Sequence, residues 1–390
     1  MGCSLCQKEY QTNDTRQSKT AKGRLQGSYI RVGDADKPMT EYEVYSYEAF
    51  RKKYRDDIRA AERVSIDTLD RDKLNEYLSR KRADRPNLAQ SPLEQQYEFT
   101  GITREHQTTL AALLLFGIYP QAYYPQLSII ATCVPGNEMG NVDLTGNRFT
   151  DTKRIEGTLP DMLDGALAFV RKNMRTATKI DTKTGARIDL PQYPMDAVRE
   201  AVLNALVHRD YSFHTEGMPI QLVMYLDRME IINPGGLYGR LTVDQLGHTQ
   251  PDTRNPVLVT AMETLGKTEN RYSGIPTIRY AMKKRSLPEP RFIDSRGTFK
   301  VILYHQSADA AAQNPVQSIK PPKGIQDDKG LIDFCRTPRS RAEIIEYLEI
   351  ASGQYALRRY LDPLIESGAI LLTLPDTPRS PKQKYVTAEK

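Results

Sequence analysis

The chain has 390 residues, of which 39% are hydrophobic and 27% are charged, and its net charge is +6. These values are ordinary for a soluble globular protein, and the length predicts two or three domains rather than one core. The longest apolar run, LAALLLFGI at 110–118, is too short to span a bilayer, and four cysteines are too few for a disulfide framework. We therefore expect a cytoplasmic protein with no membrane partner. The mildly basic charge permits a polyanionic partner without requiring one.

The first hundred residues predict a partial domain followed by a connector. Residues 1–30 are polar, a strand is expected at 29–32, and a helix begins near residue 41. We expect 1–65 to be the tail of a domain with a disordered start. Residues 66–97, which include SRKRADRP, are expected to form a charged connector.

Residues 98–306 predict one α+β region. Helices are expected at 103–118, 158–174, 194–210, 242–246, 255–265 and 275–284, and strands within LSIIATCVP, MPIQLVMYLDRMEIINPGG and GTFKVILYH. A Pro/Gln/Lys-rich linker at 307–328 then separates residues 329–390, which read as three helices followed by a hairpin. That order is typical of a winged helix-turn-helix domain.

The helix at 194–210 carries polar residues in an otherwise apolar sequence. Glu200, Asn204 and His208 recur every four residues, so they form one stripe along the helix. Apolar residues cover most of its remaining surface, which predicts burial, and buried polar groups require partners. The stripe could line a ligand site. Alternatively, the three side chains cap neighbouring loops and satisfy buried backbone groups.

Three segments together resemble a known nucleotide-binding fold: EAVLNALVH, EIINPGGL and NRYSGIPTIRYAM. They are similar to the GHKL ATPase fold of gyrase B, MutL and histidine kinases, which implies an α/β sandwich. The longer series VREAVLNALVHRDYS, EIINPGGL, RNPVL, SGIPTI, LPEPRF and GTFKVIL resembles the RecG-like C-terminal ATP-binding module of Schlafen AlbA-type transcriptional regulators. In that family an AlbA-type domain comes first, and here we expect only its tail.

The resemblance implies ATP and Mg²⁺ as cofactors. It makes Glu200 the catalytic residue that orients water and Asn204 the Mg²⁺ ligand, because Mg²⁺ prefers oxygen ligands. The other implied nucleotide contacts are Asn233, Gly235, Gly236, Arg254, Arg271 and Gly274.

Two departures from the superfamily pattern favour ATP binding over efficient hydrolysis. Asn233 stands where the superfamily has an adenine-reading Asp, and Gly274 is the one glycine where phosphate loops usually carry two or more. We assign His208 and Arg209 to structural pairing rather than to catalysis.

The C-terminal segment predicts double-stranded DNA as a partner. Basic and polar residues fall in the expected recognition helix, turn and wing, where they suit groove and phosphate contacts. The expected DNA contacts are Arg336, Arg339, Gln354, Arg358, Arg359, Arg379, Lys382 and Lys384. The alternative is a winged helix used for protein contacts or dimerisation.

These interpretations combine into an ATP-binding, DNA-binding transcriptional regulator that acts as a homodimer. Two other functions remain open: a slow ATPase accessory in nucleic-acid processing, and a degenerate, non-catalytic interaction scaffold. Turnover of ATP would distinguish the ATPase accessory, and a lack of nucleotide affinity would distinguish the scaffold.

Overall fold

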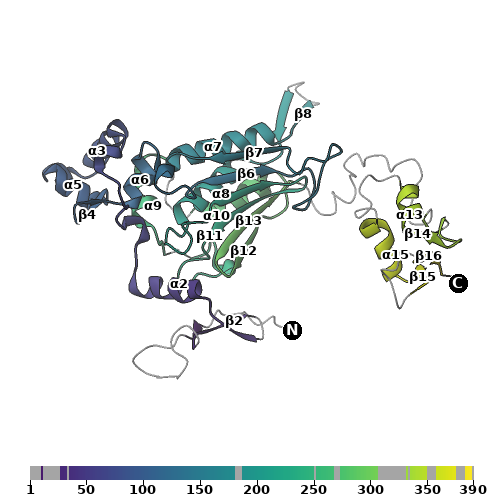
Figure 1. Cartoon of the computed structure of the whole chain (residues 1–390). Coiled ribbons are helices and arrows are strands. Elements are labelled where there is room, and N and C mark those ends of the chain that lie inside the picture. Colours follow the sequence, from purple (N-terminus) through teal and green to yellow (C-terminus); the bar gives the residue numbers. More distant parts are fainter. Residues whose placement is uncertain are drawn as a thin grey trace. The chain divides into compact units, whose positions relative to one another are not determined.

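The structure of the chain is a computed structural model that divides into two compact units, Met1–Ser307 and Ala308–Lys390 (Figure 1). It describes residues 10–11, 27–32, 35–180, 187–249, 252–267, 273–305, 331–332, 334–348, 357–374 and 383–388. In this part of the chain, no helix is long and apolar enough to cross a membrane.

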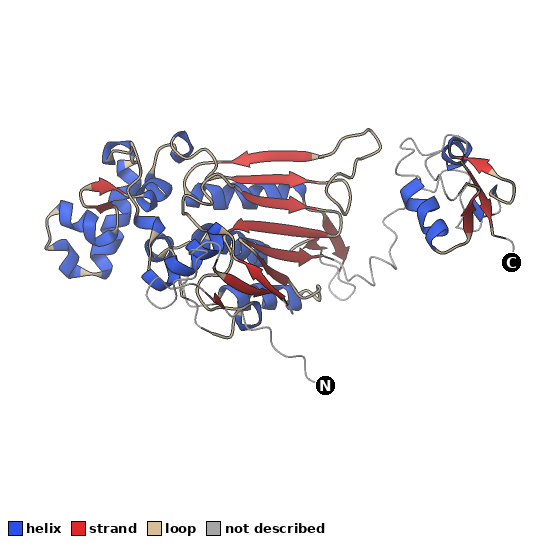
Figure 2. Cartoon of the chain, turned by 60° about the horizontal axis from the view of Figure 1, so that its bottom comes forward, coloured by secondary structure: helices blue, strands red, loops and turns tan. Residues whose placement is uncertain are grey.

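The first unit is built on a six-stranded mixed sheet (Figure 2). Its order is β12 (Arg291–Ser295), β13 (Thr298–Tyr304), β11 (Arg228–Pro234), β10 (Ile220–Met224), β6 (Ile129–Cys133) and β7 (Asp151–Ile155). Strands β6 and β10 are parallel, and the other neighbours are antiparallel. The expected α+β class is therefore confirmed.

Three helices build the layer that packs on this sheet. Helix α7 (Leu159–Asn173) contacts β6 and β7, α8 (Met195–His208) contacts β11, and α10 (Gly274–Lys284) packs against α8. Helix α9 (Pro256–Thr264) contacts α8 near one end of this layer. All four helices were predicted from sequence. The Thr158–Asp161 capping box fixes the start of α7 by satisfying amides that the helix itself leaves unpaired.

The N-terminal part of this unit also folds. Strands β1 (Tyr10–Gln11), β2 (Tyr29–Val32) and β3 (Ala35–Pro38) form a small sheet, followed by α2 (Glu41–Lys52). The stretch expected as a charged connector instead holds the 3₁₀ turn η2 (Ile66–Thr68) and helices α3 (Arg71–Asp84), α4 (Pro86–Ala89) and α5 (Leu93–Thr100). Leu74, Tyr77 and Leu78 of α3 are buried in the main core, so this stretch belongs to the unit.

The helix expected over 103–118 begins later than predicted. Strands β4 (Thr103–Arg104) and β5 (Gln107–Thr108) form a hairpin, and only α6 (Leu110–Phe116) is helical. The turn contains Glu105 and His106 at φ 51° and 64°, a left-handed conformation that non-glycine residues adopt uncommonly. Thr109 then caps α6.

Several short elements complete the first unit: η1 (Asp56–Ile58), η3 (Pro120–Ala122), η4 (Val243–Gln245), and the hairpin of β8 (Thr176–Ile180) and β9 (Arg187–Pro191). The segment expected to be helical at 242–246 is thus a 3₁₀ turn.

The second unit combines short helices with a three-stranded antiparallel sheet. Its described elements are α13 (Arg341–Leu348), a π-helical turn (Leu357–Leu361), α15 (Asp362–Glu366) and a sheet ordered β14 (Arg339–Ser340), β16 (Lys384–Thr387), β15 (Ile370–Leu372). Ser340 and Glu343 exchange hydrogen bonds at the start of α13, as expected of an N-cap. Because much of the expected recognition helix and wing lies outside the described residues, the winged helix stays a prediction.

Candidate functional site

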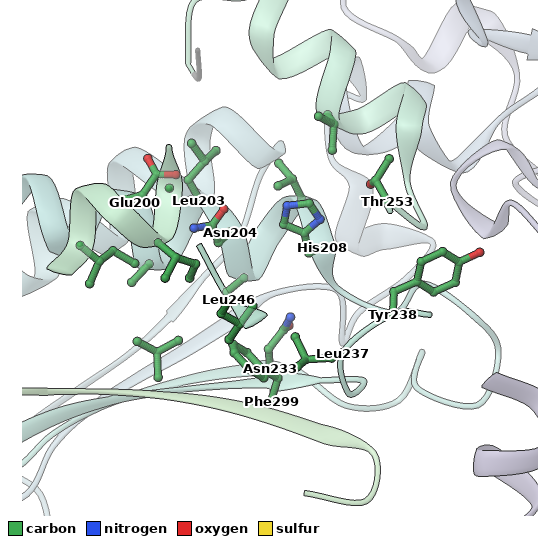
Figure 3. Close-up of a pocket in the computed structure, with 18 of the residues that line it drawn as sticks. Glu200, Leu203, Asn204, His208, Asn233, Leu237, Tyr238, Leu246, Thr253 and Phe299 are labelled. Atoms are coloured by element: carbon green, nitrogen blue, oxygen red, sulfur yellow. The ribbon is translucent and has the colours of Figure 1, made fainter. Parts of the chain in front are cut away.

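The polar stripe of α8 faces a pocket. Glu200, Asn204 and His208 all line one cavity of about 680 Å³ in the first unit (Figure 3). Its other walls come from the start of α10, the end of β11, α9 and residues within 237–249 and 252–254. The arrangement favours a ligand site over the alternative in which the stripe caps neighbouring loops.

The first turn of α10 lies directly against Glu200 and Asn204. A Cβ atom added to Gly274 would lie 2.4 Å from Glu200 Oε1 and 2.8 Å from Asn204 Nδ2, so any larger residue would displace the ends of both side chains. The free amides at a helix N-terminus carry partial positive charge and favour anions. One end of the pocket therefore joins a carboxylate, a carboxamide and a helix N-terminus.

The donor set at this end fits Mg²⁺ bound together with a ligand phosphate. Among the described residues, no group of three or more His, Cys, Asp and Glu side chains could hold a metal ion. Mg²⁺ nevertheless commonly uses only one or two protein oxygens, with waters and phosphate completing its shell. The Asn204 amide oxygen, with the Glu200 carboxylate beside it, meets that requirement.

The opposite end of the pocket holds the uncharged polar side chain of Asn233 opposite His208 (Figure 3). Asn233, at the end of β11, is only 5% exposed, and its side chain points towards His208 (Figure 3). His208 also lines the cavity and keeps accessible surface. Burial, with the nearby positive charge of Arg254, lowers the pKa of His208 to about 4, so the imidazole is neutral at pH 7.

Residues that follow His208 hold the loop after α8 in place by hydrogen bonds. The Arg209 guanidinium is buried and donates hydrogen bonds to the carbonyls of Thr215 and Met218. The Tyr211 hydroxyl donates to the Leu206 carbonyl at 2.8 Å. Arg209 therefore has the structural role expected from sequence, whereas His208 faces the pocket.

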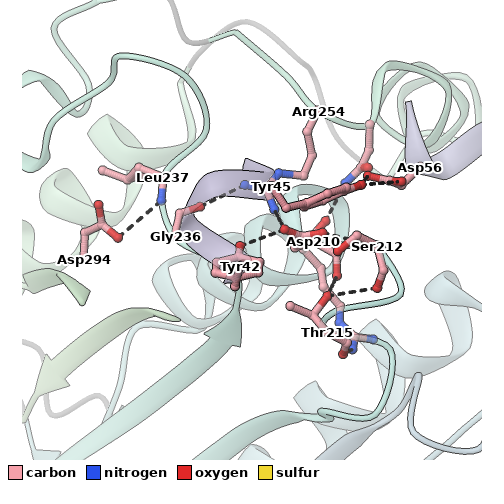
Figure 4. Close-up of polar contacts among 12 residues, drawn as sticks. Tyr42, Tyr45, Asp56, Asp210, Ser212, Thr215, Gly236, Leu237, Arg254 and Asp294 are labelled. Carbon is pink, nitrogen blue, oxygen red and sulfur yellow. Dashed lines mark hydrogen bonds and ion pairs between the residues drawn. The ribbon is translucent and has the colours of Figure 1, made fainter. Parts of the chain in front are cut away.

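Asp210 and Arg254 form a buried ion pair at the wall of the pocket (Figure 4). Arg254 Nη1 lies 2.5 Å from Asp210 Oδ2, Arg254 Nη2 donates to the Gly236 carbonyl at 3.2 Å, and the Tyr42 hydroxyl donates to Asp210 at 2.7 Å. Burial alone would raise the pKa of Asp210, but Arg254 and these hydrogen bonds outweigh it and lower the pKa. The sequence predicts a phosphate contact for Arg254, and the structure instead shows its charge neutralised by Asp210.

The Gly-Gly turn after β11 also serves packing. Gly235 has φ 98°, and a Cβ there would lie 2.5 Å from Cβ of Asp210. A Cβ on Gly236 would lie 2.7 Å from Oδ1 of Asp294. Both glycines line the pocket, and the atoms they approach closely belong to the protein, so their predicted contact with a nucleotide stays a prediction.

Helix α2 contacts the pocket wall from outside. Phe50 packs edge-to-face on Tyr238 with ring centroids 5.4 Å apart, and Lys53, which follows α2, lies 2.9 Å from Asp252. Tyr238 and Asp252 both line the pocket. The N-terminal part of the unit thus touches the pocket lining at Tyr238 and Asp252.

Sequence reasoning missed several pocket residues. The apolar and aromatic walls include Leu237, Tyr238, Leu246 and Phe299, and Lys267 lines the cavity at the end of α9. Apolar pocket walls resemble ordinary core positions in a sequence. For His208, which was assigned to structural pairing, the available signal was its position four residues after Asn204.

Some predicted residues lie outside the described part of the chain: Arg271, Gln354, Arg379 and Lys382, and the side chains of Arg358 and Arg359. In the second unit, Arg336 and Lys384 are exposed. Arg339 is half-buried, stacks over Phe334 and lies 3.5 Å from Glu343, so it already has intramolecular partners.

Comparison with known families supports the nucleotide interpretation of the first unit. Residues 217–303, which run from just before β10 to β13, match the family described as "Putative ATP-dependent DNA helicase recG C-terminal". The match supports a RecG-like, ATPase-like domain, and it indicates ATP binding. Residues 329–387 match the family described as "Filamentation induced by cAMP protein Fic-like, C-terminal domain".

A solved structure with similarity over most of the chain is a crystal structure of the DIP2311 protein from Corynebacterium diphtheriae. It is 18% identical, the match covers 92% of this chain and 69% of that one, and the TM-score is 0.48. No curated protein is similar enough in sequence to count as a match.

Proposed function

We propose that the chain is a DNA-binding transcriptional regulator that binds ATP with Mg²⁺ in the pocket between α8 and α10. The main support is the juxtaposition of Glu200, Asn204 and Gly274 at one end of the cavity of about 680 Å³. A carboxylate, a carboxamide and a helix N-terminus together suit a phosphate chain and its metal ion. The RecG-type match over 217–303 supports the same assignment.

Each residue at this end would have a distinct role. Asn204 would hold Mg²⁺ through its amide oxygen, and the ion would neutralise phosphate charge. Glu200 would accept a hydrogen bond from a water molecule beside the phosphates, and the first amides of α10 would donate to phosphate oxygens. Asn233 would contact the base. Because few fixed donors surround the phosphates, we expect slow hydrolysis or none.

The DNA-binding part of the proposal concerns residues 329–390. Arg336 and Lys384 are exposed and cationic, and the helices and three-stranded sheet of this unit are compatible with a winged helix. In the proposed function, nucleotide binding changes the segment at 237–257 and so alters how the two DNA-binding units of a homodimer engage duplex DNA.

A thermal-shift experiment on the full chain tests nucleotide binding. Mg-ATP at about 100 times its Kd should stabilise the folded protein by about 2.7 kcal/mol through ligand linkage. Asn204→Ala should remove this shift, whereas Asn87→Ala, at an exposed position of α4, should leave it unchanged. A wild-type protein with no shift at millimolar Mg-ATP would contradict the proposal.

A further inference from the structure

Two polar side chains face each other across the pocket without partners. Within the described residues, Oδ1 of Asn233 has no hydrogen-bond partner, and neither ring nitrogen of His208 has one (Figure 3). Asn233 is 95% buried, since its exposed fraction is 5%. Leaving the buried Asn233 oxygen unpaired is costly, which favours a ligand that supplies its hydrogen bond, and the His208 ring across from it is accessible to the same ligand.

The surroundings of this pair favour an uncharged ligand group. Asn233 is uncharged, and the pKa of His208 is lowered to about 4, so the ring is neutral at pH 7. The nearby Arg254 charge is neutralised by Asp210. Leu237, Leu246 and Phe299 add apolar walls. A flat, neutral heterocycle with donors and acceptors at its edges fits this environment, and a phosphate does not.

The pocket therefore has two chemically different ends along α8. Glu200 and Asn204 meet the N-terminus of α10 at one end, and His208 lies one turn further along the same face, opposite Asn233. A ligand with a phosphate chain at one end and a planar base at the other matches this order.

We propose that His208 recognises the purine base of the bound nucleotide through a hydrogen bond, opposite Asn233, and thereby determines base-dependent affinity. The inference rests on the proposed function, because it assigns a contact within the same site. A neutral imidazole presents one donor and one acceptor, and so does a carboxamide. Adenine offers a neighbouring amino donor and ring-nitrogen acceptor, a pattern that a carboxamide pairs with in bidentate fashion. The imidazole supplies a hydrogen bond at another ring position.

The test separates base binding from phosphate binding by calorimetric titration of the full chain with Mg-ATP and with Mg-tripolyphosphate, which has no base. His208→Ala and His208→Phe should each weaken Mg-ATP roughly tenfold, the value of one neutral hydrogen bond, because Phe keeps a flat ring but has no ring nitrogen. Tripolyphosphate affinity should not change. His106→Gln, an exposed histidine in the β4–β5 turn, is the control and should bind both ligands as wild type.

The outcomes distinguish this inference from the proposed function. If wild type binds Mg-ATP and both His208 variants bind it equally well, the two side chains hold only water and the inference is wrong. If His208→Phe alone retains full affinity, the ring stacks rather than hydrogen-bonds, which also overturns the inference. Equal wild-type affinity for ATP and tripolyphosphate would leave phosphate binding intact but exclude a base site. A wild-type protein that binds neither ligand overturns both.

Discussion

Asp57→Asn should change how stability depends on pH, because Asp57 is a fully buried carboxyl group. Its side chain accepts a hydrogen bond from the Val257 amide at 2.9 Å, at the start of α9, and its other oxygen has no partner among the described residues. Burial raises the pKa of Asp57 from 3.8 to about 6, despite the opposing amide hydrogen bonds. The ionised form is therefore the unfavourable one in the folded protein.

The magnitude follows from proton linkage. A shift of about 2 pKa units corresponds to about 3 kcal/mol. Because the folded pKa is raised, the folded state binds more protons than the unfolded state between about pH 4 and pH 6. The contribution of Asp57 to stability is thus fully present below pH 4, and it is lost as the pH rises through 6.

Asparagine can keep the hydrogen bond from Val257 but does not ionise. The free energy of unfolding of Asp57→Asn minus that of wild type should therefore rise by about 2.5 kcal/mol from pH 4 to pH 7. Urea titrations of both proteins at several pH values measure this difference, in which the contributions of the other carboxylates cancel. If the free energies of unfolding of the two proteins change in parallel with pH, Asp57 is not a buried carboxyl group whose ionised form is unfavourable.

Further predictions concern the pocket, the ion pair and the second unit. Gly274→Ala should weaken Mg-ATP binding in a titration while the far-ultraviolet circular dichroism is retained, because its Cβ would displace the Glu200 and Asn204 side-chain ends; unchanged affinity would contradict the geometry. Asp210→Asn should destabilise the protein by about 3–5 kcal/mol in urea unfolding, because a buried guanidinium loses its partner. Steady-state ATPase assays should show little turnover, and brisk turnover that disappears in Glu200→Ala would favour the ATPase alternative. Fluorescence anisotropy with duplex DNA tests the second unit. Lys384→Gln in the full chain should lower the slope of the logarithm of the binding constant against the logarithm of the salt concentration by about one. Arg358→Ala should reduce the difference in binding free energy between preferred and other DNA sequences by about 1–3 kcal/mol.

Local patterns in the sequence predicted much of the first unit. The spacing of Glu200, Asn204 and His208 was enough to place three pocket residues on one face of α8. Helix α7 was recognisable from its apolar period and from Pro160 in its first turn. These features depend on residues a few positions apart, which is why a single sequence reveals them.

Features that depend on distant residues were not predictable in the same way. The pairing of Arg254 with Asp210 joins two segments that only the fold brings together, so the sequence alone favoured a phosphate contact. The Glu105–His106 turn has no glycine to signal its left-handed backbone. In α3, Leu74, Tyr77 and Leu78 did carry a helical apolar spacing, but the density of charges around them favoured a connector.

The most direct test of the proposed function is a calorimetric titration of the full chain with ATP in the presence of Mg²⁺ and again with EDTA. We predict saturable binding of one nucleotide per chain that is weakened when Mg²⁺ is removed and lost in Asn204→Ala. Binding that is indifferent to Mg²⁺ and to Asn204→Ala, or no binding at millimolar ATP, would contradict the assignment of the α8–α10 pocket as a nucleotide site.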